Sequence, residues 1–137
     1  MVRRKGDMVV TIRPDETVEA LLALLEQHRI GAVVVSEDGT TVAGIVSERD
    51  VVRKLHARGA DVLAATVASI MTSDVHTCDF ETTAEELART MTDLRVRHVP
   101  VVVDGRLRAI VSIGDIVKQR MDELQAERDQ LVGYIQQ

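Results

Sequence analysis

The sequence is poor in aromatic residues and in cysteine. Its 137 residues include no tryptophan, one tyrosine and one phenylalanine, so the core must be built from aliphatic side chains. The single cysteine, Cys78, excludes an intrachain disulfide framework and favours a reducing compartment. The longest unbroken apolar run is about five residues, far short of the ~20 that a membrane-spanning helix needs.

The charge balance also narrows the classes of partner. Seventeen basic and 22 acidic side chains give a net charge of -5, which disfavours unspecific binding to nucleic acid or to an anionic membrane. The basic start of the chain lacks the apolar stretch of a signal peptide. We therefore expect a cytoplasmic protein that binds neither nucleic acid nor a membrane.

Sequence motifs for catalysis are missing. There is no P-loop and no GxGxxG motif, and the four histidines are scattered without metal-ligand spacing. Cys78 has no evident activating partner, so a place in a strand or in the core is the simpler interpretation. We predict no catalytic residue, no catalytic cofactor and no metal site, and hence a protein that is not an enzyme.

The most informative feature is an internal repeat. Residues 29–35, Arg-Ile-Gly-Ala-Val-Val-Val, align with residues 95–101, Arg-Val-Arg-His-Val-Pro-Val. An Asp-Gly pair follows each segment, and an Ile-Val-Ser-x-x-Asp motif ends at Asp50 in one half and at Asp115 in the other. The offset is 66 residues and falls to 65 because the first half has one extra residue. Two halves this small are marginal alone, so we expect them to share one core about a pseudo-twofold axis.

Each half predicts the same order of elements. An extended segment (9–12 or 75–78) precedes a helix, whose start signal is Asp15 or Thr17 in the first half and Thr82 or Thr83 in the second. A strand rich in β-branched residues follows, then a tight Asp-Gly hairpin, a return strand and a second helix that begins at the motif serine.

The domain boundaries follow from this order. We predict a first repeat over residues 8–56, an inter-repeat linker with a helical turn over 57–73, a second repeat over 74–120 and a C-terminal helix over 121–137. Apolar residues recur along the last helix, with Arg128 where one more would complete the stripe. The stripe needs a partner, which is either a second copy of the chain or the chain's own body, against which the first half of the helix would pack while its end frays.

The repeated Ser-x-x-Asp motif has two interpretations. In the first, Ser47 and Ser112 cap a helix, and Asp50 and Asp115 complete a capping box. In the second, the aspartate accepts both hydroxyls of a ribose, while the serine and the free N–H groups of the helix start face a phosphate. The interpretations are compatible, and the presence of two copies favours a role beyond capping.

These residues resemble the CBS domain family, named after cystathionine beta-synthase, in a tandem pair called a Bateman module. The resemblance covers about residues 8–120 and is strongest to small bacterial proteins made of this pair and a C-terminal helix. It implies an α+β (α/β) fold of two β-α-β-β-α repeats packed about a pseudo-twofold axis. It also implies two clefts that bind adenosine compounds such as AMP, ADP, ATP, S-adenosylmethionine or NAD(H), and modules that often pair into dimers.

The resemblance carries site residues over position by position. It assigns the ribose hydroxyls to Asp50 and Asp115. It assigns ribose or phosphate contacts to Ser47, Arg49, Arg97, His98, Ser112 and Gly114. It assigns the adenine to Val9, Thr11, Ile30, Gly31, Val75, Thr77 and Val96. Arg97 and His98 replace Gly31 and Ala32 of the first half, and a guanidinium offers a fixed fork of donors to phosphate. We therefore expect the Asp115 cleft to be the better occupied.

The predicted function is that of a non-enzymatic regulatory module. It would bind an adenosine nucleotide, AMP being the ligand we favour, and signal to an unknown effector protein through a change in conformation or in a homodimer. Arg49, Arg97 and His98 also have simpler interpretations, as solvated charges and a half-buried imidazole. The alternative function is a ligand-independent dimeric scaffold that binds a partner through its C-terminal helix.

Overall fold

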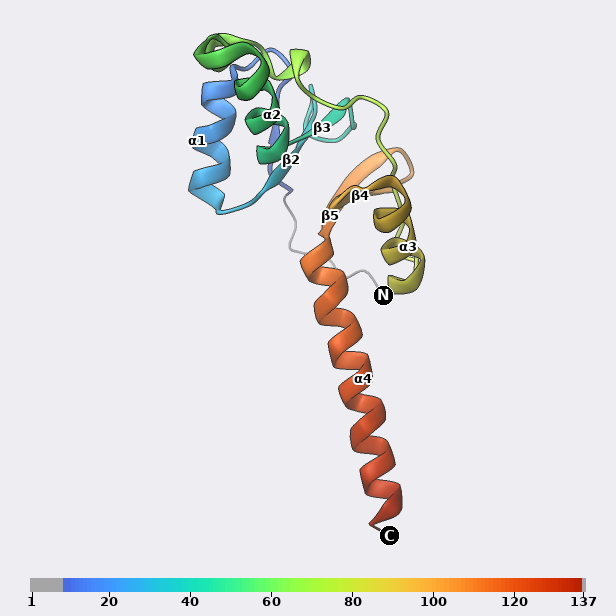
Figure 1. Ribbon diagram of the computed structural model, residues 1–137. Coiled ribbons are helices and arrows are strands. Elements are labelled where there is room, and N and C mark those ends of the chain that lie inside the picture. The colour runs from blue at the N-terminus through green and yellow to red at the C-terminus, as the bar shows by residue number, and fades with distance from the viewer. Residues whose placement is uncertain (1–8, 137) are drawn as a thin grey trace.

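The computed structural model describes residues 9–136, which form two lobes and a long protruding helix (Figure 1). The first lobe contains β1 (Thr11–Ile12), α1 (Val18–His28), β2 (Ala32–Val35), β3 (Gly44–Ser47), α2 (Glu48–Arg58) and the 3-10 helices η1 (Gly59–Ala64) and η2 (Val67–Ser69). The second lobe contains α3 (Ala84–Leu94), β4 (His98–Val103), β5 (Arg106–Ser112) and the start of α4 (Ile113–Ile135). The predicted α+β fold of two repeats and a terminal helix is confirmed.

Threonine side chains start the first helix of each lobe. Thr17 caps α1 by accepting a hydrogen bond from the N–H of Ala20 over 3.1 Å. Thr83 caps α3 by accepting from the N–H of Glu86 over 3.1 Å, and the Glu86 carboxylate accepts from the N–H of Thr83 over 3.0 Å. Each helix begins at the second of its two predicted start residues, because the threonine side-chain oxygen satisfies an amide that has no partner within the helix.

The repeat in sequence is also a repeat in strand register. In the first lobe β1 pairs in parallel with β2, and β2 in antiparallel with β3. In the second lobe β4 pairs in antiparallel with β5. Ile12 lies beside Val35, as Cys78 lies beside Val101 at the same offset. The extended segments are shorter than predicted, since β1 has two residues and its counterpart is the single bridge at Cys78.

The prediction of a tight Asp-Gly hairpin holds in one lobe only. In the second lobe Asp104 and Gly105 have φ values of 54° and 76° and connect β4 to β5 directly, as a two-residue turn requires. In the first lobe residues 36–43 form a longer loop between β2 and β3, so the prediction is wrong there. Asp38 organises that loop, because its carboxylate accepts hydrogen bonds from the N–H groups of Thr41 and Thr40 over 2.8 and 2.9 Å. These bonds hold the pKa of Asp38 well below its ordinary value.

Each lobe has its own cluster of buried side chains, so the core that the two halves share is limited to the layer between their sheets. In the first lobe α1 and α2 contribute Leu21, Leu25 and Val51 to a cluster with one face of the sheet. In the second lobe Leu87 of α3 and Ile116 of α4 pack against β4 and β5. Two lobes this small can hold separate clusters because contacts between their sheets join the lobes.

The lobes meet through the opposite faces of their sheets. Side chains alternate along a strand, so Ala32 and Val34 of β2 and Pro100 of β4 point away from the helices of their own lobe. All three are nevertheless buried, which indicates that these faces pack together. The N–H of Leu107 also donates to the carbonyl oxygen of Thr40 over 2.6 Å, a hydrogen bond between the lobes.

Most of the inter-repeat segment packs with the first lobe. Val62, Val67 and Ile70 belong to the buried cluster of that lobe. Thr72 then forms an antiparallel bridge with Ile45, which extends the sheet beyond β3. The segment contains two 3-10 helices where the sequence predicts a helical turn.

Helix α4 leaves the second lobe and extends far from both lobes (Figure 1). The apolar residues of its predicted stripe are between 51 and 73% exposed: Val117, Met121, Leu124, Leu131 and Ile135. Within residues 9–136 only the start of α4 packs against the body of the chain, through Ile116, and the stripe itself has no intrachain partner there.

Candidate functional site

Two equivalent helix starts hold the residues predicted to bind ribose. Ser47 caps α2: its N–H donates to Asp50 Oδ2 over 2.8 Å, and the N–H of Asp50 donates to Ser47 Oγ over 3.3 Å. Ser112 and Asp115 repeat this arrangement at the start of α4, over 2.9 and 3.2 Å. The capping-box interpretation of the motif is confirmed in both lobes.

The capping box leaves acceptor capacity on the carboxylate of Asp50. Both of its contacts with Ser47 involve Oδ2, and Oδ1 accepts no hydrogen bond from residues 9–136. A carboxylate has about four acceptor positions, so two further hydroxyl donors can be accommodated. The Ser47 hydroxyl itself donates to Asp50 over 3.1 Å, and that of Ser112 to Asp115 over 3.0 Å. The serines therefore fix the orientation of both carboxylates.

Each helix start keeps one amide directed outward. The first helical N–H, of Glu48 or Ile113, donates to the carbonyl oxygen of Gly31 or of the equivalent Arg97 over 2.9 or 2.8 Å. The third helical N–H is bonded to the capping serine. The second helical residues are Arg49 and Gly114, and their N–H groups have no partner within residues 9–136. An amide at this position, with the positive end of the helix dipole, suits an anion.

The two predicted sites adjoin where the lobes meet. A β-carbon placed on Gly31 would lie 3.4 Å from Glu48 Oε1 and 3.8 Å from His98 Cε1 of the other lobe. His98 pairs with Ser112 across β4 and β5, just as Ala32 pairs with Ser47. The structure thus brings Gly31, His98 and the two capping serines into one region. Glu48 was not predicted as a site residue, and the signal for it is its place directly after Ser47.

The two arginine side chains predicted to hold phosphate lie at the surface, whereas His98 is half-buried. Arg49 and Arg97 are exposed, and neither forms an ion pair within the described part of the chain. A β-carbon on Gly114 would meet only Ser112 Oγ, at 3.6 Å, so the backbone there is open to approach. Both guanidinium groups are therefore available to an anionic ligand.

The residues predicted to contact adenine occupy equivalent places in the two lobes. Thr11 is half-buried and lies beside Val34 in the parallel pairing of β1 with β2. The same register, continued two residues back, places Val9 level with Ala32, which pairs with Ser47 of β3. In the second lobe Val75 is half-buried and Thr77 is exposed.

Two other predicted adenine contacts take part in the packing of their own lobes. Ile30 and Val96 connect the first helix of each lobe to the following strand, and both pack against the buried cluster of that lobe. Their side chains therefore offer a ligand only their outer edges.

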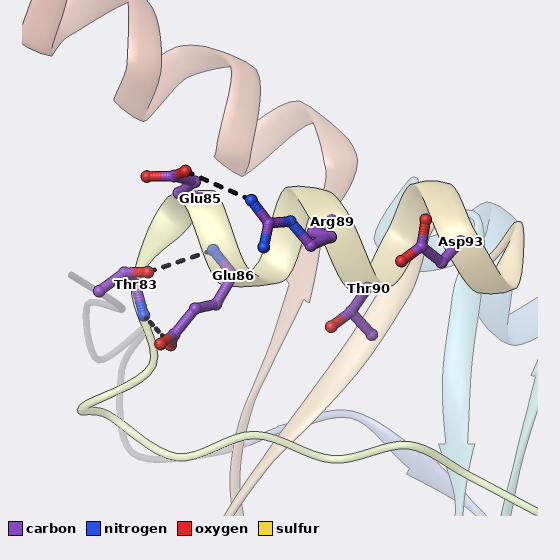
Figure 2. A pocket seen from close by; sticks show the side chains of 6 residues that line it. All are labelled: Thr83, Glu85, Glu86, Arg89, Thr90 and Asp93. Atoms are coloured by element: carbon purple, nitrogen blue, oxygen red, sulfur yellow. Dashed lines mark hydrogen bonds and ion pairs between the residues drawn. The ribbon is translucent and has the colours of Figure 1, made fainter.

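A surface hollow lies elsewhere, along α3 (Figure 2). Its lining consists of Thr83, Glu85, Glu86, Arg89, Thr90 and Asp93. In Figure 2 Thr83 and Glu86 exchange the hydrogen bonds of the capping box, and Arg89 reaches back to Glu85 over 3.6 Å. Four of the six lining residues thus engage one another in pairs, and none of the predicted site residues lines the hollow.

Cys78 lacks the properties of a nucleophile. It is half-buried beside β4. Burial, and to a smaller extent the negative charge of Asp79, raises the pKa of its thiol to about 11. Within residues 9–136 no group of three or more histidine, cysteine, aspartate or glutamate residues could hold a metal ion. None of the helices in the same part of the chain is long and apolar enough to span a membrane.

Comparisons with known proteins agree with this architecture. A CBS-domain-containing protein of Agrobacterium tumefaciens has 44% sequence identity and a TM-score of 0.81, with 85% of this chain and 93% of that chain covered. The mitochondrial CBS domain-containing protein CBSX3 of Arabidopsis thaliana is 37% identical over 126 residues, which are 89% of this chain and 61% of the relative.

A more distant neighbour shows the same fold with ligands bound. It is a CBS domain pair solved in complex with 5′-methylthioadenosine and S-adenosyl-L-methionine, at 23% identity and a TM-score of 0.75. The alignment covers 83% of this chain and 92% of that one.

The family model for the CBS domain matches twice, over residues 6–57 and 67–122. Each match contains one capping box of the Ser-x-x-Asp type, at the same place after the return strand. The chain therefore belongs to the CBS domain family and contains a pair of these domains.

Proposed function

We propose that this CBS domain pair is a regulatory module that binds an adenosine nucleotide at the starts of α2 and α4. The observation that carries the proposal is the pair of matching capping boxes, each with an aspartate at a helix start beside an outward amide. The ribose diol would donate to Asp50 or Asp115, and the phosphate would accept from the amide of Arg49 or Gly114. The distant CBS pair solved with two adenosine compounds supports this class of ligand.

The two sites are unequal, and the second is the better candidate for a phosphorylated ligand. Arg97 stands where the first lobe has Gly31, so the second site gains a guanidinium with no ion pair of its own. Gly114 replaces Arg49 and opens the backbone amide to close approach. We favour AMP, because its single phosphate can be held by one amide and one guanidinium without a metal ion.

Regulation would follow from the position of the sites between the lobes. Gly31 lies close to His98 of the other lobe, and the hydrogen bond from Leu107 to Thr40 joins the lobes. A ligand can shift the relative orientation of the lobes only if it binds one arrangement more tightly than another. A nucleotide that contacts Gly31 of the first lobe together with Arg97 or His98 of the second would satisfy that condition, and an effector protein or a second copy would detect the shift.

Isothermal titration calorimetry with AMP, ADP, ATP and NADH tests the proposal. AMP has about 23 heavy atoms, so ~0.3 kcal/mol per atom gives a Kd on the order of 10 μM. Absence of binding by all four compounds at millimolar concentration, with a folded protein, would refute it.

A ligand-independent scaffold is the second candidate, favoured by the exposed apolar stripe of α4. In this case truncation after Lys118 abolishes binding to the effector, while Asp115→Ala leaves it unchanged. Nucleotide-dependent signalling predicts that Asp115→Ala alters effector binding.

A further inference from the structure

Helix α4 carries an apolar stripe that the described part of the chain leaves uncovered. The α4 stripe consists of Val117, Met121, Leu124, Leu131 and Ile135, each more than half exposed. The steps between its members are four, three, seven and four residues, with Arg128 in the gap of seven. These are the steps between the core positions of a heptad repeat, which two helices bury when they pair side by side.

The stripe lies on a different side of α4 from the contact with the lobe. Ile116 is buried in the second lobe, and Gln119 and Glu123 on the same side are partly covered. At about 100° per residue, the centre of the stripe is turned by about 130° from these residues. Figure 1 shows the helix extending away from both lobes, so a partner helix could lie along it.

We infer that the occupant is a second copy of this chain and that two α4 helices pair in antiparallel about a twofold axis at Ala126. The spacing is self-complementary in this orientation. Val117 then lies opposite Ile135 of the second copy, Met121 opposite Leu131, and Leu124 opposite Arg128. Every apolar member of the stripe is covered, and no layer contains two charges.

Arg128 selects the antiparallel orientation over the parallel one. In a parallel pair the two Arg128 side chains would share one core layer, which places like charges together. In the antiparallel pair each Arg128 packs its aliphatic stem on Leu124 of the second copy, and its guanidinium extends to water. In the single chain the whole Arg128 side chain is 70% exposed. The positive end of each helix dipole also lies beside the negative end of the other.

The geometry has a consequence for the assembly. Helix α4 has 23 residues, which at 1.5 Å per residue is a rod of about 35 Å. An antiparallel pair places the two CBS domain pairs at opposite ends of this rod. The dimer therefore forms through residues outside the nucleotide sites and does not depend on the function proposed above.

Sedimentation velocity of the full chain and of two aspartate variants tests the interface. We expect the parent chain to be a dimer. Leu124→Asp should weaken the association of the two copies at least tenfold and so convert the dimer to a monomer. Val52→Asp is the matched control, because Val52 is 63% exposed on α2 and lies outside the stripe. A monomeric parent chain, or a dimer that survives Leu124→Asp, overturns the inference.

Disulfide cross-linking in a Cys78→Ser background then tests the orientation. Gln125→Cys flanks the twofold axis, so two copies should cross-link on oxidation. Leu131→Cys should not, because its two copies would be ten residues apart along the rod, or about 15 Å. Cross-linking of Leu131→Cys without Gln125→Cys indicates a parallel pair and overturns the inference, as does a dimer that neither variant cross-links.

Discussion

Gly44 of β3 lies so close to Thr72 that a β-carbon on the glycine would be 2.8 Å from the Thr72 carbonyl oxygen. It would also lie 2.6 Å from Met71 Sδ. The inter-repeat segment can approach this closely because Ile45 and Thr72 exchange two backbone hydrogen bonds, each of 2.9 Å. Gly44 thus permits the strand to be extended by the segment that leads into the second lobe.

The first prediction concerns Gly44→Ala. The methyl group would meet backbone at Thr72, which has less freedom to move than a flexible side chain, so we expect a loss of about 1–3 kcal/mol in the free energy of unfolding. Gly133→Ala is the matched control, since a β-carbon on Gly133 would meet nothing within 4 Å. In helix α4 that change should stabilise by about 0.5–1 kcal/mol. Urea denaturation followed by circular dichroism measures both, and equal effects would contradict the close approach.

The sequence predicts elements best where local chemistry decides them. Thr17, Thr83, Ser47 and Ser112 cap helices as expected, because a hydroxyl at these positions binds an amide only a few residues away. The Asp38-Gly39 pair misleads, since its carboxylate binds Thr40 and Thr41 and supports a longer loop. The separate clusters and the closeness of Gly31 to His98 depend on residues far apart in the sequence, which spacing alone does not reveal.

The second prediction separates ligand binding from helix capping. Asp115→Asn removes the negative charge and one of the two oxygens that would accept hydrogen bonds from the ribose hydroxyls. It keeps one oxygen that can accept from the N–H of Ser112. We expect AMP affinity to fall at least tenfold by calorimetry, with a small change in stability. Glu86→Gln makes the same chemical change in the capping box of α3, outside the predicted site. Equal affinities in the two variants would assign Asp115 to capping alone.

The third prediction concerns the phosphate. Replacing Arg97 by Gln removes an exposed guanidinium that has no ion pair within residues 9–136. We expect weaker binding of AMP, by about tenfold, and unchanged binding of adenosine, because only the phosphate would contact Arg97. Arg95→Gln, two residues earlier at the end of α3, is the control and should bind both compounds like the parent chain. A parallel loss for adenosine would show that Arg97 acts on the fold instead.

The site was predictable only in part. The Ser-x-x-Asp motif locates Asp50 and Asp115, and the repeat makes their equivalence evident. That Ser47 Oγ donates to its aspartate, while the amide of Arg49 is left outward, depends on hydrogen-bond geometry. Glu48 beside Gly31 was missed because its contact requires the turn of the chain between β3 and α2.

The last prediction uses the single thiol as a probe of pH. Burial and the nearby charge of Asp79 raise the pKa of Cys78 from 9.0 to about 11. Near neutral pH the thiolate fraction should therefore be about 100-fold lower than in the unfolded chain, and alkylation correspondingly slower. The rate should rise with pH towards an apparent pKa near 11. Because the unfolded chain releases this proton first, the thiol's contribution to folding stability is complete below about pH 9 and is lost as pH rises towards 11.

The chain contains one cysteine, so every alkylated product reports Cys78. The same chain in concentrated urea is the control, with an expected apparent pKa near that of a free thiol, about 8.5–9. Alkylation can be slow because the thiol is protonated or because the reagent reaches it poorly. A pH profile separates these causes, since poor access lowers the rate at every pH without moving the midpoint. A midpoint near 9 in the folded protein would show that Cys78 is more hydrated than its half-buried place beside β4 implies.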